Sequence, residues 1–475
     1  MSGRVADAEG LAELRGAALG PVLAPGDPGY EEARGARLFN GAYAHRRPGV
    51  IVRCMGVADV QLAIGFARAS GLPIAVRGGG HSPSGSSTTD GGVLLDMSLM
   101  HGVHVDPERR VAVVGPGTLL SELDRETQVH GLAAPAGVVS HTGVAGLTLG
   151  GGVGRLMRKH GLTVDNVLGF DLVTADGEWR HADADTHPDL FWALRGGGGQ
   201  LGIVTSFEFA LHPVGPTVLG GSLGWPLAQA REVYRQLREE IAAAPEDLAL
   251  QLIFVIGPDA EFIPPELRGQ PTLMMPVTWL GENFEEGERA LAPFREKVPP
   301  VLNMVMPMPY TLLQSSSDVL APHGRRGCSL PGYLDDLSEE ILDIAIDLVE
   351  RFPTDFSVLE FSQMGGAVGR VPADATASSA FRDAGFFYIA GANSWEEADD
   401  AAMEEWVRAA DAAFEPFRLP GRYINFLSDD DEDNLRDAIG TPTAIRLAEI
   451  KARYDPDGLF AHNPNARPQP TSATT

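Results

Sequence analysis

One short stretch of this sequence combines residue types that could hold a ligand and react with it. It reads Arg77-Gly78-Gly79-Gly80-His81-Ser82 and follows the apolar run 72–76, which predicts a short buried strand. Glycines let the backbone approach a ligand closely and point several N–H groups at one place, which suits a phosphate or pyrophosphate. Arg77 adds a positive charge, and the serines from Ser82 onward add hydroxyl donors. We therefore predict an anion-binding loop that carries a histidine.

Two further glycine clusters follow this loop. The first runs from Ala136 to Gly154, and so many glycines favour a backbone that wraps closely around a flat or charged ligand. The second lies within 189–205 and contains a match to G-x-G-x-x-G. A nicotinamide-binding fingerprint needs a strand before the match and a helix after it. Here a helix is predicted over 188–194 and a strand over 203–211, so we reject that interpretation.

The first loop must be positioned by the elements around it. Residues 49–54 predict a strand, and 57–70 have the apolar spacing of a helix. With the strand at 72–76, this order predicts a βαβ unit that ends at the glycine loop.

The bulk properties bound the class of protein. The chain has 475 residues, which favours two domains, and a net charge of −27, which argues against nucleic-acid partners and anionic membrane surfaces. It has two cysteines, so no disulfide framework or cysteine-rich metal site is expected. No signal-like or membrane-spanning apolar run occurs, and we expect a cytoplasmic protein. The sequence leaves the oligomeric state open.

The middle of the chain differs from its first part. Residues 249–256, 272–279, 357–364 and 386–390 predict strands, whereas 282–298 and 338–352 predict helices. Their order lacks regular βα alternation, which favours an antiparallel sheet covered by helices. The fold class expected for the chain is therefore α+β.

Taken together, the glycine clusters carry a resemblance to a known family. The motifs are Arg77 to Ser82 with Gly85; Gly143 to Gly154 followed by Asp165-Asn166; Leu190 to Gly199 with Gly202-Ile203-Val204-Thr205; and, near the C-terminus, Arg422 to Phe426, Asp455 to Phe460 and Asn463-Pro464-Asn465. In this order they resemble the FAD-linked oxidases of the berberine bridge enzyme type, within the vanillyl-alcohol oxidase/p-cresol methylhydroxylase (PCMH) fold. The similarity spans the whole chain and is looser in the middle.

The resemblance implies a cofactor, a domain plan and a set of binding residues. FAD would be linked covalently to His81 in a two-part PCMH-type domain formed by 1–213 and 421–475, with a substrate domain at 214–420 between the parts. Many family members carry a second link through a cysteine, but Val139 stands at that position, so a single attachment is expected. The other residues expected to contact FAD are Arg77, Gly78, Gly79, Gly80, Ser82, Gly85, Val139, Thr142, Gly143, Gly146, Gly150, Gly151, Gly152, Gly199, Gly202, Ile203, Val204, Asn425 and Asn463.

The same resemblance raises a question about the catalytic base. Family members that oxidise alcohols often have Tyr-x-Asn-Tyr, in which the second tyrosine takes the hydroxyl proton, but Phe426 occupies that place here. Phenylalanine cannot accept a proton, so either another residue acts or the reaction needs no such base. We predict Tyr423, Gln363 and Tyr388 as the catalytic candidates, with Gln363 orienting the substrate.

The implied function is an FAD-dependent oxidase. It would take hydride from a C–H next to oxygen or nitrogen of a small organic substrate and reduce molecular oxygen to hydrogen peroxide. The alternatives are a dehydrogenase, a biosynthetic oxygenase or cyclase on the same flavin, or a flavin-binding protein without turnover. We expect no metal, and the acidic run 429–433 fails the EF-hand pattern and is expected to be a solvated loop.

Overall fold

The chain begins with a small sheet built around one helix. The computed structural model describes residues 8–378, 381–427 and 438–460. Across the sheet the strands are β1 (Val22–Leu23), β2 (Val50–Arg53), β4 (Val93–Asp96) and β3 (Ile74–Arg77), with β2, β4 and β3 parallel. Helix α3 (Val57–Ser70) connects β2 to β3, which run parallel on either side of β4, because parallel strands of one sheet need such a crossover. The predicted βαβ unit is confirmed, and the first glycine loop leaves β3. Helix α1 (Ala8–Ala17) packs on α3, and helix α2 (Tyr30–Gly35) packs on β2.

A second, antiparallel sheet follows. Its strands, in spatial order, are β5 (Val103–Asp106), β6 (Val111–Val114), β10 (Ile203–Ala210), β8 (Val167–Val173) and β9 (Trp179–Asp183). Its helices are α4 (Leu120–Gln128), α5 (Val144–Leu149), α6 (Met157–His160) and α7 (Pro188–Leu194). Helix α7 precedes the third glycine run and β10 follows it, which confirms the helix–loop–strand order that excluded a nicotinamide site. Strands β7 (Leu132–Ala133) and β11 (His212–Pro213) pair beside this sheet.

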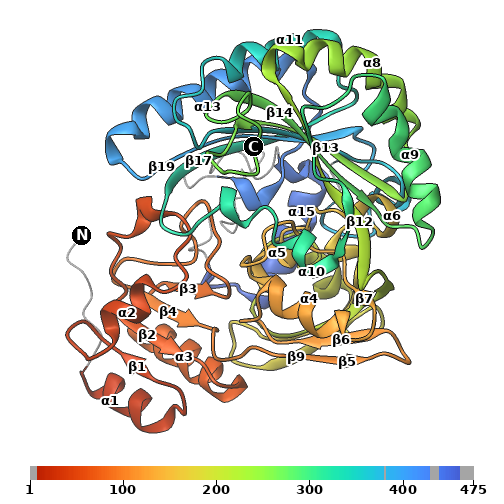
Figure 1. The fold of residues 1–475 in the computed structure, drawn as a ribbon. Helices are drawn as coiled ribbons and strands as arrows, with labels where there is room; N and C mark the ends of the chain where they lie inside the picture. The colour runs from red at the N-terminus through yellow and green to blue at the C-terminus, as the bar shows by residue number, and fades with distance from the viewer. Residues whose placement is uncertain (1–7, 379–380, 428–437, 461–475) are drawn as a thin grey trace, which may run out of the picture.

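The third sheet is antiparallel and has eight strands. Their order is β15 (Leu302–Asn303), β12 (Thr217–Pro226), β14 (Pro271–Trp279), β13 (Leu248–Ile256), β18 (Val358–Gln363), β19 (Phe386–Ser394) and β17 (Arg326–Leu334), while β16 (Met306–Pro309) also pairs with β12. Helices α8 (Ala230–Ala243), α9 (Phe284–Glu296), α11 (Glu339–Val349) and α13 (Asp400–Phe414) cover one face (Figure 1). The predicted helix-covered antiparallel sheet, and with it the α+β class, is confirmed.

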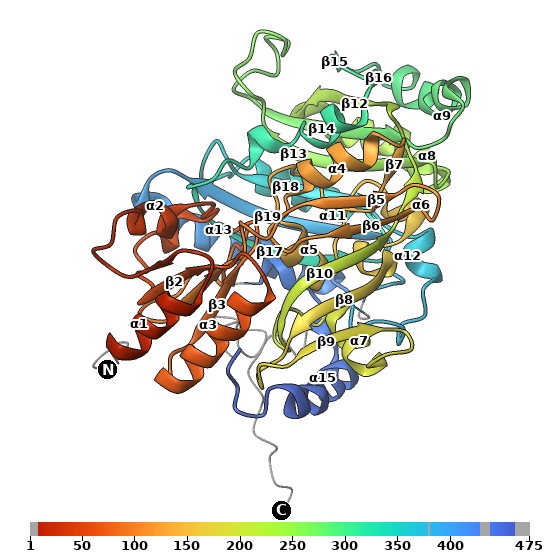
Figure 2. The same cartoon turned by 90° about the horizontal axis from the view of Figure 1, so that it is seen from below.

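The other face of this large sheet looks toward the glycine clusters. Short helices α10 (Tyr310–Gln314) and α12 (Ala367–Arg370) bridge to the second sheet region through contacts with α4 and α6. Helix α15 (Thr441–Tyr454) lies beside α7, so this late segment of the chain packs against the first half of the fold (Figure 2). No helix among the described residues is long and apolar enough to cross a membrane.

Candidate active site

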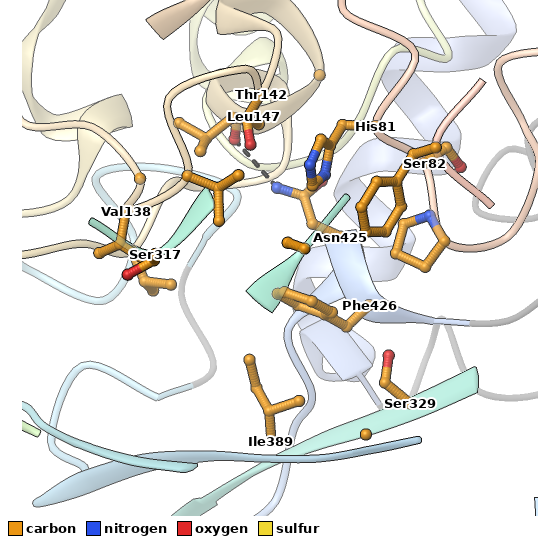
Figure 3. Close-up of a pocket in the computed structure, with 18 of the residues that line it drawn as sticks. His81, Ser82, Val138, Thr142, Leu147, Ser317, Ser329, Ile389, Asn425 and Phe426 are labelled. Atoms are coloured by element: carbon orange, nitrogen blue, oxygen red, sulfur yellow. Dashed lines mark hydrogen bonds between the residues drawn. The ribbon is translucent and has the colours of Figure 1, made fainter. Parts of the chain in front are cut away.

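A large cavity lies between the glycine clusters and the open face of the eight-stranded sheet. Its volume is about 810 Å³. All three glycine clusters contribute to its wall, together with strands β13, β17, β18 and β19 and the segment 423–426. Figure 3 shows side chains from the first two clusters, β17, β19 and the segment 423–426. A large concave cavity of this kind is a usual place for a cofactor and its substrate.

The first two glycine clusters touch each other backbone to backbone. A Cβ atom on Gly79 would lie 2.3 Å from the Cα and N atoms of Gly143, so neither loop could carry a side chain at this contact. Gly146 also lines the cavity, but a Cβ there would meet no atom within 4 Å. Among the described residues none accepts a hydrogen bond from the N–H of Gly79 or Gly80. The clusters thus provide a close-packed backbone, open space and free N–H donors.

His81 stands at the end of the first loop, in the cavity wall. Its ring stacks on Phe39 with centroids 3.8 Å apart, and His141 and His323 lie 5.1 and 6.0 Å away. Burial, reinforced by these two histidines, lowers the pKa of His81 to about 3. Its Nε2 atom is buried and has no hydrogen-bond partner among the described residues. At neutral pH His81 is therefore an uncharged imidazole, the form that can act as a nucleophile.

The structure brings most of the predicted cofactor residues to one cavity. Those that line it are Gly78, Gly79, Gly80, His81, Ser82, Val139, Thr142, Gly143, Gly146, Gly150, Gly199, Gly202, Ile203, Val204 and Asn425. Asn463 lies outside the described residues, as does the acidic run 429–433.

Four residues that we predicted to contact the cofactor do not line the cavity. Arg77 points away from the loop into the protein, where it donates to Ala33 O and Arg34 O and pairs with Asp96. We predicted that it would add charge to the anion site, but its side chain lies on the face of the sheet where the carbonyls of α2 accept from it. Gly85, Gly151 and Gly152 adopt positive φ angles in turns outside the cavity wall.

Tyr423 lines the cavity, but its hydroxyl oxygen already accepts hydrogen bonds from other residues of the protein. It accepts hydrogen bonds from the Gly152 N–H and the Asn425 amide, both at 2.9 Å, and burial raises its pKa. A hydroxyl held in this way fixes the second glycine cluster to the C-terminal segment and is poorly suited to accept a substrate proton. Asn425 also donates to Leu147 O at 3.1 Å, and Phe426 extends toward the sheet (Figure 3).

The other two catalytic candidates are placed by strand alternation. Side chains on a strand point alternately to opposite faces. On β19, Tyr388 and Ala390 pack under the helices, whereas Phe387 and Ile389 line the cavity. Tyr388 is therefore on the wrong face for catalysis, which corrects our prediction.

Gln363 lies at the end of β18 and borders the cavity. Its amide nitrogen, however, donates to Ile241 O of α8 at 2.7 Å, on the helix-covered side of the sheet. This bond holds the amide away from the open face, so the structure gives Gln363 a packing role where we predicted substrate orientation.

The same alternation presents an acid that sequence reasoning missed. On β18, Leu359 and Phe361 face the helices, so Glu360 and Ser362 face the cavity. Glu360 Oε1 accepts from Ser362 Oγ at 2.6 Å and from the Gln251 amide at 2.7 Å. Burial raises the pKa of Glu360. The signal was present as an apolar–polar alternation within the predicted strand 357–364, but a strand's faces cannot be assigned without its neighbours.

Comparison with known proteins agrees with this architecture. The FAD binding domain family matches residues 48–183. An FAD-linked oxidoreductase of Dictyostelium discoideum is 31% identical over 429 residues, which cover 89% of each chain. The chain belongs to the FAD-linked oxidoreductase family.

Solved structures agree with this flavoenzyme assignment. The crystal structure of 6-hydroxy-D-nicotine oxidase from Arthrobacter nicotinovorans has a TM-score of 0.84 at 27% identity and covers 95% of this chain and 98% of its own. A berberine bridge enzyme-like protein of Physcomitrella patens shares the fold, with a TM-score of 0.83 at 22% identity over 95% of this chain and 97% of its own. The chain is thus an FAD-dependent oxidoreductase, and it shares its fold with a berberine bridge enzyme-like protein.

The cavity residues of this flavoenzyme fit FAD. The free N–H groups of Gly79 and Gly80 suit its pyrophosphate, and the open space at Gly146 suits a ligand packed against the backbone. The unpartnered Nε2 of His81 marks a reactive side chain at the same wall.

Gly79→Ala should abolish most flavin binding, because its Cβ would push the first two glycine clusters apart. The visible flavin absorbance per protein measures the outcome. The matched control is Gly65→Ala in the exposed part of α3, where a Cβ meets no atom within 4 Å and should leave flavin content unchanged. Normal flavin content in Gly79→Ala would show that this contact does not shape the cofactor site.

Proposed function

We propose that this flavoenzyme is an oxidase that removes hydride from a C–H next to oxygen or nitrogen of a small organic substrate and reduces molecular oxygen to hydrogen peroxide. FAD supplies the hydride acceptor and the route for electrons to oxygen. The protein supplies a site that positions the substrate and accepts the proton that its O–H or N–H loses.

The position of the Glu360 carboxylate in the cavity wall is the observation that supports this proposal. It is a carboxylate on the wall that faces the glycine clusters, and both of its described hydrogen bonds go to Oε1. Oε2 is therefore left for the substrate. Because burial raises the pKa of Glu360, its carboxylate is a stronger base than an exposed one. This assigns the proton-accepting role to Glu360, where our prediction from the sequence had looked to tyrosines.

Covalent attachment of FAD through His81 is a further part of the proposal. The imidazole is neutral at physiological pH because burial lowers its pKa, and its Nε2 is free among the described residues. Val139 lines the cavity at the position where many family members carry a second link through a cysteine, and its side chain has no nucleophilic atom. These features support one link rather than two.

The similarity to 6-hydroxy-D-nicotine oxidase supports oxygen as the electron acceptor. Anaerobic mixing of the holoenzyme with a panel of alcohols and amines tests the proposal, and flavin absorbance should bleach with at least one of them. Admitting oxygen should then restore the colour and release one hydrogen peroxide per substrate. Bleaching that artificial acceptors reverse and oxygen does not would identify a dehydrogenase, and oxygen incorporated into product would identify an oxygenase. An unreduced flavin with every compound would contradict turnover of this substrate class.

A further inference from the structure

Arg155 is a buried guanidinium in the cavity wall whose hydrogen-bonding capacity is only partly used. It follows the second glycine cluster and is 6% exposed. Nη1 donates to Gln251 Oε1 at 3.4 Å, and Nη2 donates to the hydroxyls of Ser316 and Ser317, each at 3.2 Å. These contacts are long for a charged donor. The Nε–H is buried and has no partner among the described residues.

The charge on Arg155 is also incompletely compensated. Its hydrogen-bond partners are all neutral side chains, and among the described residues no carboxylate forms an ion pair with it. Glu360 attracts Arg155 electrostatically without a direct hydrogen bond, and Gln251 lies between them, accepting from Arg155 and donating to Glu360. A buried guanidinium stays protonated although burial lowers its pKa, so an unpaired one is costly unless a ligand supplies the counter-charge.

Two other arginines line the cavity among the described residues, and they differ in how far their donors are used. Arg158 donates to four backbone carbonyls, those of Met364, Pro245, Leu248 and Ala244. Arg325 stacks on the rings of Phe356 and Trp395, but its Nε–H also has no partner among the described residues. Arg155 is the more deeply buried of these two arginines, and it is the one that Gln251 connects to Glu360.

We propose that Arg155 binds a carboxylate of the substrate, so that the substrate class is a small hydroxy acid or amino acid-like compound. This inference rests on the proposed function. The carboxylate would accept a hydrogen bond from the free Nε–H and a second one from an η nitrogen, whose present contacts are long and would be displaced. A planar guanidinium binds carboxylates in this bidentate fashion. Glu360, on the other side of the Gln251 amide, would face the hydroxyl or amine whose neighbouring C–H is oxidised. The chain's net charge of −27 repels anions, so an anionic substrate needs such a local cation.

Calorimetric titration of the oxidised holoenzyme tests this inference without turnover. The probes are benzoate, phenylacetate and propionate, each compared with its neutral amide. At least one carboxylate should bind the wild type roughly tenfold to a hundredfold more tightly than its amide, the worth of a charge-assisted hydrogen bond. Arg155→Gln should lose that preference, and Arg155→Lys should keep part of it. Arg231→Gln removes the same charge from an exposed pair with Asp343 and should keep all of it.

The result that overturns the inference is an equal affinity of the wild type for every acid and its amide, or a preference that survives in Arg155→Gln. Flavin content and the far-ultraviolet spectrum of each variant show that it is folded. The outcome is separable from that of the proposed function: oxidation of neutral alcohols or amines without carboxylate binding would remove Arg155 as the anchor and leave the oxidase in place. Carboxylate binding with no flavin reduction would keep Arg155 as the carboxylate anchor and remove the proposed oxidase activity.

Discussion

Glu360→Gln should lower the rate constant of flavin reduction by about 10²- to 10⁴-fold, the usual contribution of a positioned base. Glutamine has the shape of glutamate and can still accept a hydrogen bond from Ser362, but it cannot accept a proton. Stopped-flow absorbance under anaerobic conditions measures the rate once a substrate is identified. Glu246→Gln, a change outside the cavity wall, is the matched control and should reduce flavin at the wild-type rate.

The pH dependence of this reaction follows from the direction of the pKa shift. Burial raises the pKa of Glu360 above its ordinary value, and the deprotonated form is the active one. The rate in the wild type should therefore rise with pH through a window above about 4.3, and Glu360→Gln should lack this rise. A raised carboxyl pKa also means that ionised Glu360 opposes folding at neutral pH, so the variant should be no less stable than the wild type. A Glu360→Gln rate within a few-fold of wild type would remove Glu360 as the base.

Asp165→Asn should destabilise the protein by about 3–5 kcal/mol, because it leaves a buried guanidinium without its counter-charge. Asp165 and Arg382 form a two-pronged ion pair at 2.6 and 2.7 Å, and their side chains are 6% and 3% exposed. Arg382 also holds the segment before β19 through Ser378 O and Thr376 Oγ1. The pair thus fastens the second glycine cluster region to the large sheet.

Chemical denaturation followed by far-ultraviolet circular dichroism measures this effect. Asp343→Asn breaks the exposed pair with Arg231 and should cost less than about 1 kcal/mol. The double variant Asp165→Asn/Arg382→Met should recover part of the loss, since it removes the unpaired charge as well. Equal unfolding midpoints for Asp165→Asn and Asp343→Asn would contradict a structural role for this pair.

Local patterns in the sequence predict much of this fold. The spacing of Val60, Ile64 and Ala67 predicts α3, and the apolar run before Arg77 predicts β3, because both elements bury one continuous apolar face. The glycine clusters predict the cofactor side of the cavity, since a close backbone contact such as that of Gly79 with Gly143 tolerates no side chain. These are constraints that a residue meets within its own segment.

The substrate side could not be predicted in the same way. Whether Tyr388 or Ile389 faces the cavity depends on which face of β19 the helices cover, and helices distant in sequence decide this. Glu360 acquires its raised pKa from burial on β18, which pairs with β13, and these two strands come together only in the folded chain. Arg77 follows the same rule, because its partner Asp96 lies on a neighbouring strand.

Acid precipitation of the purified protein shows whether FAD is attached covalently to His81. We expect a yellow pellet from the wild type and a colourless pellet with yellow supernatant from His81→Ala. Val139→Ala, at the neighbouring wall of the cavity, should precipitate yellow like the wild type. A colourless wild-type pellet, or a yellow one from His81→Ala, would contradict covalent attachment at this residue.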